Sequence, residues 1–470
     1  MDTSGSQSNR LRKGVLKTGD AIAQSVAVLA LVMAIALSTS FAAQFAGAAA
    51  PLAYVVAALG SLCLAYVIIR FSRRMASAGS VYTYISQSLG PATGFIGGWL
   101  YAGAFAIGIA FTMAIASVYL QGVLANFSVN VDWFVLFCGL LVVLFLFAFF
   151  DIRIATRVQL TFAALGILSV LVLAFIILAK GGDSGLSLAP FSPTSLPNGL
   201  SGLFFATVFS FTSFIGFEAA AVLGEETANP RYTIPRAILI AVLVGAVFYI
   251  FVTFTFSIGY GVTHAAKWAT DQTVLDTLAK RYANSALATF IDVMVSIDAF
   301  VASLAGLNLV ARIFYAMGRD RSLPSVFGLT HPRYKSPWVG IVVALVITFV
   351  LGVTLGRSLR PFNFFGFLAT VGSLGILIAY ILVAISGMVF FLRSQQDRGL
   401  IVVADIVLPV IAILLCGATI YSTIIPVPPS PLNLAPYIVA AWLILGLLLL
   451  AVLWFTNREQ VLRFGRTLGE

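Results

Sequence analysis

Charged residues are scarce in this sequence. Of its 470 residues only 9% are charged and 60% are hydrophobic, and the mean hydropathy is +1.05. A soluble chain cannot bury that much apolar surface, so the composition indicates a helical protein that crosses a membrane several times. The apolar runs extend over about 20 residues or more, whereas the strands of an outer-membrane barrel are alternating segments of roughly ten residues.

Cysteine and histidine are also rare. Cys63, Cys138 and Cys416 lie in separate apolar runs without a neighbouring histidine, and the two histidines fall in connecting segments. This spacing predicts neither a metal site nor a disulfide. No nucleophile–base set stands out, so we expect no enzyme activity and no cofactor.

The net charge of +10 is a topology signal and not a nucleic-acid footprint. Reading apolar runs between charged or Pro/Gly-rich breaks predicts twelve spans. They cover residues 21–47, 51–71, 91–124, 131–150, 158–179, 199–224, 235–262, 285–317, 338–356, 363–392, 401–425 and 436–455. With the first residues in the cytoplasm, the basic residues that fall outside are Lys180, Lys267, Lys280, Arg281, Arg357 and Arg360, six of 27. Such an excess of inside charge predicts two cytoplasmic termini and no nucleic-acid partner.

The sixth predicted span carries an ionisable group beside a helix breaker. Its segment SFIGFE, Ser213 to Glu218, contains Gly216 and Glu218. Carriers built from inverted repeats bind substrate where two matching helices are interrupted near the bilayer midplane. A glycine can instead mark a close helix crossing, but such a crossing needs no carboxylate. The pattern therefore favours a helix interruption.

The first predicted span offers a weaker counterpart. Its polar patch VMAIALSTSFAAQ, Val32 to Gln44, has hydroxyl groups but no glycine. Serine and threonine in a membrane helix can simply bond to the carbonyl of the preceding turn. A binding segment and an ordinary helix both stay open here. Without an arginine ladder or a filter-like loop, a carrier is favoured over a channel.

Three longer stretches resemble the amino acid–polyamine–organocation superfamily of carriers. They are SRRMASAGSVYTYISQSLGPATGFIGGW (72–99), FIGFEAAAVLGEETANPRYTIPRAI (214–238) and ARIFYAMGRDRSLPSVFGLTHPRYKSP (311–337). The resemblance implies an all-α integral membrane fold of twelve transmembrane helices. In this leucine-transporter-like fold, helices 1–5 and 6–10 form a five-plus-five inverted repeat with broken helices 1 and 6.

The resemblance also implies how the chain is divided. Residues 1–20 would form an N-terminal tail, 21–180 the first repeat, 199–393 the second, 401–455 two further helices and 456–470 a C-terminal tail. Both tails are expected in the cytoplasm, and the protein in the plasma (inner) membrane.

The function implied is secondary active transport of amino acids or related amines by alternating access, coupled to protons. A polyamine or small-amine permease and a substrate exchanger are the alternatives within carriers, and a nutrient sensor or a channel lies outside them. The expected partners are the small-molecule substrate, the proton and the lipid bilayer. The sequence predicts no oligomeric state.

Members of the superfamily usually carry a Gly-Ser/Thr-Gly break in the first span. Counted back from AGSVYTY, its counterpart here is Ala34-Ile35-Ala36. The resemblance then places a substrate carboxylate on amides around Ala34 to Leu37, and an amino group on the carbonyls of the sixth-span interruption and on Asp298. The candidate substrate-binding residues are Ala34, Ile35, Ala36, Leu37, Ile107, Phe111, Phe211, Phe214, Ile215, Gly216, Phe217 and Asp298, with Phe364 or Phe365 beside them.

Two carboxylates within the spans are candidates for proton coupling. Glu218 matches an acidic position common in the superfamily, and Asp298 lies near the middle of the eighth predicted span. A carboxylate at this depth is costly unless it is partnered or protonated. Each could instead hold helices together through permanent hydrogen bonds. Sodium coupling is disfavoured because the candidate pair Ala302-Ser303 lacks one hydroxyl.

Overall fold

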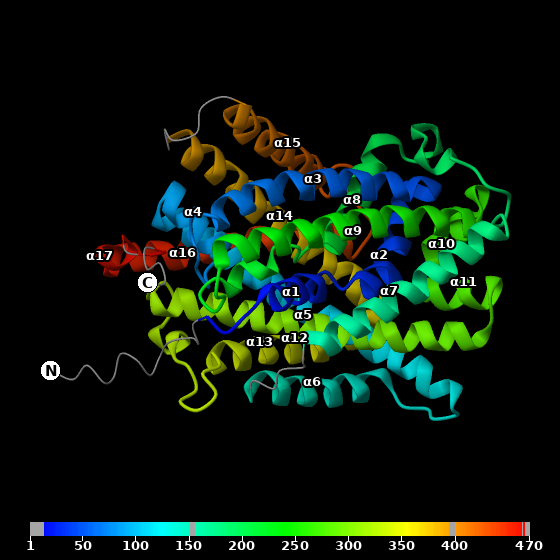
Figure 1. The fold of residues 1–470 in the computed structure, drawn as a ribbon, viewed down its shortest axis with the longest axis horizontal. Helices are drawn as coiled ribbons and strands as arrows, with labels where there is room; N and C mark the ends of the chain where they lie inside the picture. The colour runs from blue at the N-terminus through cyan, green and yellow to red at the C-terminus, as the bar shows by residue number, and fades with distance from the viewer. Residues whose placement is uncertain (1–13, 151–155, 394–399, 463, 466–470) are drawn as a thin grey trace.

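The computed structural model describes residues 14–150, 156–393, 400–462 and 464–465. Over these residues the chain is helices and connecting turns, and no strand is formed beyond one isolated bridge between Leu16 and Thr227. Figure 1 shows long helices side by side, with α4 and α17 at one end of the bundle and α10 and α11 at the other.

The helices that build the bundle have the following bounds. They are α1 Thr18–Leu29, α2 Leu31–Ala46, α3 Ala50–Ser72, α4 Val81–Leu89, α5 Pro91–Asn126, α6 Trp133–Phe149, α7 Thr156–Ala179, α8 Gly199–Phe214, η4 Ala219–Leu223, α9 Pro230–Tyr260, α10 Ala265–Thr270, α11 Val274–Tyr282, α12 Ser285–Arg319, α13 Trp338–Leu351, α14 Arg357–Arg393, α15 Leu400–Ser422, α16 Ala435–Thr456 and α17 Arg458–Val461.

Nine helical runs in the described part of the chain are long and apolar enough to cross a membrane. Two of these runs hold more than one helix. The run Thr18–Ser72 contains α1, α2 and α3, and the run Trp338–Arg393 contains α13 and α14 with a π-helical turn at Gly352–Gly356. Lengths and compositions of this kind are those of a multi-pass membrane protein.

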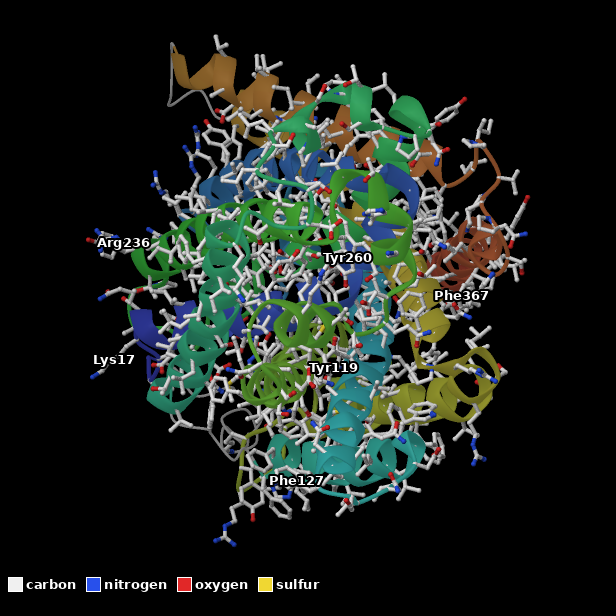
Figure 2. All side chains as sticks on the ribbon, turned by 90° about the vertical axis from the view of Figure 1, so that its right-hand side faces the viewer. Lys17, Tyr119, Phe127, Arg236, Tyr260 and Phe367 are labelled. Carbon is white, nitrogen blue, oxygen red and sulfur yellow. The ribbon has the colours of Figure 1, made fainter. Side chains whose placement is uncertain are left out.

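Helix α5 lies in the centre of the bundle. It packs along α12 and α14 and also against α4 and α6. A helix that is apolar all round is a buried helix, and most of α5 is buried, including Tyr119 near its end. Figure 2 shows the contrast: Tyr119 and Tyr260 lie toward the middle of the molecule, whereas Phe127, 70% exposed, lies at its edge.

Hydrogen bonds tie down the bundle end that carries α10 and α11. Ser40 of α2 donates to the carbonyl of Asp271, and the Tyr260 hydroxyl donates to the Asp271 carboxylate, both at 2.7 Å. In the connection after α7, the Asp183 carboxylate pairs with His264 and Arg281. Hydrogen bonds from His264 and Arg281 hold the pKa of Asp183 below its usual range.

The helical backbone is interrupted at buried residues within the first and the sixth predicted spans. Ala30, with φ 46° and ψ 60°, separates α1 from α2. Gly216, with φ +102°, separates α8 from η4. The predicted position of the first of these interruptions is wrong. Residues 34–36 lie inside α2, about one helical turn after the bend at Ala30. The Ala34 amide already makes a helical hydrogen bond, 2.8 Å long, to the carbonyl of Ala30.

Position 216 requires a glycine for two reasons, which are its backbone conformation and the lack of room for a side chain. A positive φ of this size is readily adopted by glycine and costs other residues on the order of 1–3 kcal/mol. A Cβ at this position would also lie 2.1 Å from Cγ1 of Val28 in α1. The interruption at Gly216 therefore packs directly against the end of α1.

This close approach predicts that Gly216→Ala is destabilising by about 2 kcal/mol or more. The matched control is Gly122→Ala in α5, where a Cβ meets nothing within 4 Å and alanine is the better helix former. Thermal unfolding of the two detergent-purified variants would measure the difference. Equal midpoints for Gly216→Ala and the unaltered protein would show that position 216 accommodates a side chain.

Candidate functional site

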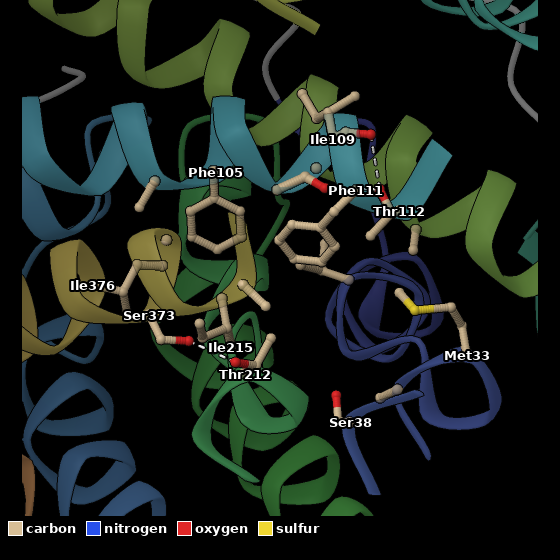
Figure 3. A pocket seen from close by; sticks show the side chains of 18 of the residues that line it. Met33, Ser38, Phe105, Ile109, Phe111, Thr112, Thr212, Ile215, Ser373 and Ile376 are labelled. Carbon is tan, nitrogen blue, oxygen red and sulfur yellow. Dashed lines mark hydrogen bonds between the residues drawn. The ribbon is translucent and has the colours of Figure 1, made fainter. Parts of the chain in front are cut away.

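A cavity of about 70 Å³ lies beside the two interruptions. This is more than the roughly 10–15 Å³ that one water needs. Its walls come from six helices, α1, α2, α5, α8, α12 and α14, and from Ile215 just after α8 (Figure 3). The lining residues are Val28, Leu29, Met33, Ala34, Ser38, Ala104, Phe105, Gly108, Ile109, Phe111, Thr112, Thr212, Ile215, Ala302, Gly306, Phe365, Ala369, Gly372, Ser373 and Ile376.

Most of the cavity wall is apolar. Phe105 and Phe111 of α5 face it side by side in Figure 3, and the ring of Phe365 meets that of Phe111 edge-on with centroids 5.2 Å apart. Its polar groups are four hydroxyls, and no charged side chain is among the lining residues. Such a wall suits a small solute with an apolar body and few polar atoms.

The start of α2 is capped by a carboxylate from a distant helix. Asp298 of α12 accepts hydrogen bonds from the amides of Val32 and Met33, both at 3.0 Å to Oδ2. The first amides of a helix have no partner within it, and its dipole favours a negative charge there. Asp298 thus satisfies the amides that the bend at Ala30 frees.

The carbonyls freed at the two interruptions share one hydroxyl group. Tyr249 Oη of α9 lies 3.0 Å from the Leu29 carbonyl oxygen and 2.8 Å from that of Ser213. Leu29 ends α1 and Ser213 lies one residue before the end of α8. Tyr249 therefore joins the two helix ends beside the cavity.

Glu218 connects the second interruption to the centre of the bundle. The side chain is completely buried, and its Oε1 accepts from the hydroxyls of Tyr101 in α5 at 2.6 Å and Tyr380 in α14 at 2.8 Å. Two residues on, the Ala220 amide donates to Ser25 Oγ of α1 at 3.0 Å. The segment around η4 is therefore attached to α1, α5 and α14.

Of the predicted substrate-binding residues, the structure brings Ala34, Phe111 and Ile215 to the cavity wall, together with Phe365. Gly216 packs against Val28. Asp298 lies at the start of α2 and not among the lining residues.

The other predicted residues point elsewhere. Ile107 lines a separate apolar crevice between α5, α14 and α16. Phe211 reaches Gly60 of α3, and Phe214 packs edge-on against Tyr249. Phe217 lies 6.0 Å from Tyr380, centroid to centroid. Ile35, Ala36 and Leu37 are buried within α2 without lining the cavity.

Several residues of the site were not predicted. The cavity hydroxyls of Thr112 and Ser373, and the bridging tyrosines, carry no motif in the sequence, whereas Ser38 belongs to the polar patch Val32 to Gln44, for which the sequence leaves a binding segment open. Their one signal is a hydroxyl in the middle of an apolar span, and many serines and threonines of membrane helices give that signal while only bonding to their own helix.

A cavity beside helix interruptions inside a multi-pass bundle has the form of a membrane carrier. Known proteins identify the family. Residues 23–450 match the family model described as amino acid permease. The chain is 30% identical to the branched-chain amino acid permease BcaP of Lactococcus lactis subsp. cremoris over 82% of its own length and 83% of that protein.

Two further relatives are named for other substrates. The chain is 30% identical to cationic amino acid transporter 4 of Mus musculus over 77% of its length and 56% of that protein. It is 26% identical to the low-affinity putrescine importer PlaP of Escherichia coli over 74% of its length and 75% of that protein. The chain belongs to the amino acid permease family, within the amino acid–polyamine–organocation superfamily.

The shared hydroxyl predicts that Tyr249→Phe destabilises the protein by about 1–3 kcal/mol, because it leaves two buried carbonyls without their donor. Tyr437→Phe is the matched control, since Tyr437 is 73% exposed. Thermal unfolding in detergent measures both variants. A Tyr249→Phe protein as stable as the control would mean that the hydroxyl does not join the two helix ends.

Proposed function

We propose that this protein is a secondary active transporter that moves amino acids or related amines across the plasma membrane by alternating access. The observation that carries the proposal is the cavity, lined by six helices beside two interruptions. The relatives are named for the transport of amino acids and putrescine, which supports amino acids or amines as the substrate class.

The proposed architecture has twelve spans in a five-plus-five inverted repeat. Counting α1 with α2 and α8 with η4 as broken spans supports that number. The repeats would cover 21–180 and 199–393, followed by two helices in 401–455, with tails 1–20 and 456–470 in the cytoplasm. The interruptions at Ala30 and Gly216 support this division, because each lies in the first span of its half.

Alternating access requires contacts that close one side and can open. At the end that carries α4, Arg312 Nε donates to Glu226 at 2.6 Å, and Arg319 Nη1 lies 3.1 Å from both oxygens of Glu225. These ion pairs join α12 to the segment that follows η4. We assign them to the closed gate on the cytoplasmic side.

Glu218 is the carboxylate that we assign to proton coupling. Its partners are hydroxyl groups, which can donate to a carboxylate or accept from a protonated carboxyl. Asp298 is bound to two amides, which can only donate. Glu218 can therefore change protonation state while it keeps its neighbours, whereas the two amide donors on Oδ2 favour the ionised form of Asp298. A change at Glu218 would be felt by α5, α14 and η4 together.

The test is uptake into proteoliposomes of radiolabelled leucine, lysine, putrescine and small monoamines with an inward pH gradient. We expect saturable accumulation of at least one compound that collapses when the gradient is removed. We expect Glu218→Gln to lose the response to the gradient while still catalysing exchange. Glu459→Gln, at an exposed position, is the matched control.

Four results would overturn parts of this proposal. Non-saturating flux would indicate a channel, and binding without flux would indicate a sensor. Gradient-driven accumulation by Glu218→Gln at the rate of the control would remove Glu218 from coupling. Uptake that needs substrate on the opposite side, with or without a gradient, would favour an exchanger.

A further inference from the structure

We propose that the cavity binds a primary amine with an apolar chain and no carboxylate, and that Asp298 occupies the place where an amino acid would put its carboxylate. This inference rests on the proposed transport function and specifies its substrate class. It follows from the hydrogen-bond donors and acceptors beside the cavity.

The start of α2 has no free pair of amides to offer a ligand. The amides of Val32 and Met33 are bound to Asp298, and that of Ala34 donates to Ala30. A ligand carboxylate would have to displace Asp298 and then lie close to a like charge, which is unfavourable. The helix start that suits an anion thus already holds one that belongs to the protein.

The hydroxyl protons at the α5 wall are also used. Ser303 donates to the carbonyl of Ala299 at 2.9 Å, and Thr112 lies 2.7 Å from Ser303 Oγ and 3.0 Å from the Gly108 carbonyl oxygen. Each hydroxyl has one proton, so both protons are committed within the protein. Thr112 therefore presents lone pairs to the cavity.

The opposite wall repeats this arrangement. Thr212 donates to the carbonyl of Val208 at 2.9 Å, and Thr212 and Ser373 are 2.6 Å apart. Once Thr212 donates to its own helix, the proton of Ser373 is left for the contact between the two hydroxyls, which a dashed line marks in Figure 3. Among the lining hydroxyls of the described chain, only Ser38 makes no hydrogen bond. One donor is too few for a carboxylate, which accepts about four.

An ammonium group, unlike a carboxylate, finds suitable partners at the cavity wall. The oxygens of Thr112 and Thr212 and the carbonyl end of α1 are acceptors, and the rings of Phe105 and Phe111 offer cation–π contacts. Asp298 borders a separate pocket beside α1 and α7, and its charge on the amides at the start of α2 supplies a counter-charge from outside the cavity. No carboxylate lines the cavity, so a diamine would leave its second ammonium unpaired. The remaining wall is apolar, and the ligand is therefore a monoamine with an aliphatic chain.

The experiment compares ligands that differ only in the carboxylate. Dissociation constants of isoamylamine and leucine, and of isobutylamine and valine, are measured calorimetrically on the unaltered full chain in nanodiscs, with putrescine alongside. We expect each monoamine to bind at least about ten-fold tighter than its amino acid, since an unpaired charged group costs that much or more. Putrescine should bind more weakly than isoamylamine.

The outcomes separate this inference from the proposed function. Leucine binding as tightly as isoamylamine, or putrescine binding tighter than isoamylamine, overturns the inference and leaves a transporter of amino acids or diamines. Binding and uptake of none of these compounds overturns both. Neither result depends on a variant that folds.

A variant then tests the role of Asp298 directly. Asp298→Ala frees the amides of Val32 and Met33, and we expect it to shift the ratio of the leucine and isoamylamine affinities about ten-fold toward leucine. Asp298→Asn keeps an acceptor oxygen and should shift the ratio less, and Glu459→Ala not at all. A folded Asp298→Ala protein with an unchanged ratio would show that Asp298 does not stand in for a ligand carboxylate.

Discussion

The structure depends on satisfying backbone groups where two helices are interrupted inside an apolar bundle. Within a bilayer an unpaired amide or carbonyl costs several kcal/mol, so irregular backbone is tolerated only where other groups pair with it. Here those groups come from distant parts of the chain: Asp298 for the amides of α2, Tyr249 for the carbonyls that end α1 and α8, and Ser25 for Ala220. These contacts place the two interruptions side by side and so create the cavity between them.

The same contacts determine what the cavity offers a ligand. Because the protein supplies its own carboxylate and hydroxyls to the freed backbone, the wall keeps acceptors, aromatic rings and small apolar side chains. Glu218 takes no part in forming the cavity wall. It lies beyond Gly216 and is bonded to α5 and α14 through two tyrosines. Ligand recognition and the proposed response to protons thus use different carboxylates.

The two interruptions differ in how far sequence predicts them. Gly216 is visible because glycine and a nearby glutamate are both unusual in a span, and the structure places the break there. Ala30 has no such signal, since Leu29, Ala30 and Leu31 are ordinary helix residues. Its left-handed conformation is held by Asp298 and Tyr249, more than 200 residues away. Counting from a neighbouring motif therefore placed the break one turn too far along. Phe111 and Ala34 were predicted as ligand contacts and line the cavity, but no local pattern distinguishes them from the other aromatic and small residues.

The cross-helix bonds also constrain how such a carrier moves. Tyr249 bonds to both α1 and α8, so these helix ends and α9 are held as one unit, whereas Asp298 attaches the start of α2 to α12. If α1, η4 and α9 rock relative to α12, the bend at Ala30 is the point between the two attachments. The hydrogen bonds of Tyr249 and Asp298 lie on opposite sides of Ala30, but the hydrogen bond from Gln24 of α1 to the Ala305 carbonyl of α12, 3.1 Å long, would break in such a movement. Ala30 therefore lies between two anchored helix ends, and a ligand in the adjoining cavity touches both sides of it through Leu29 and Met33.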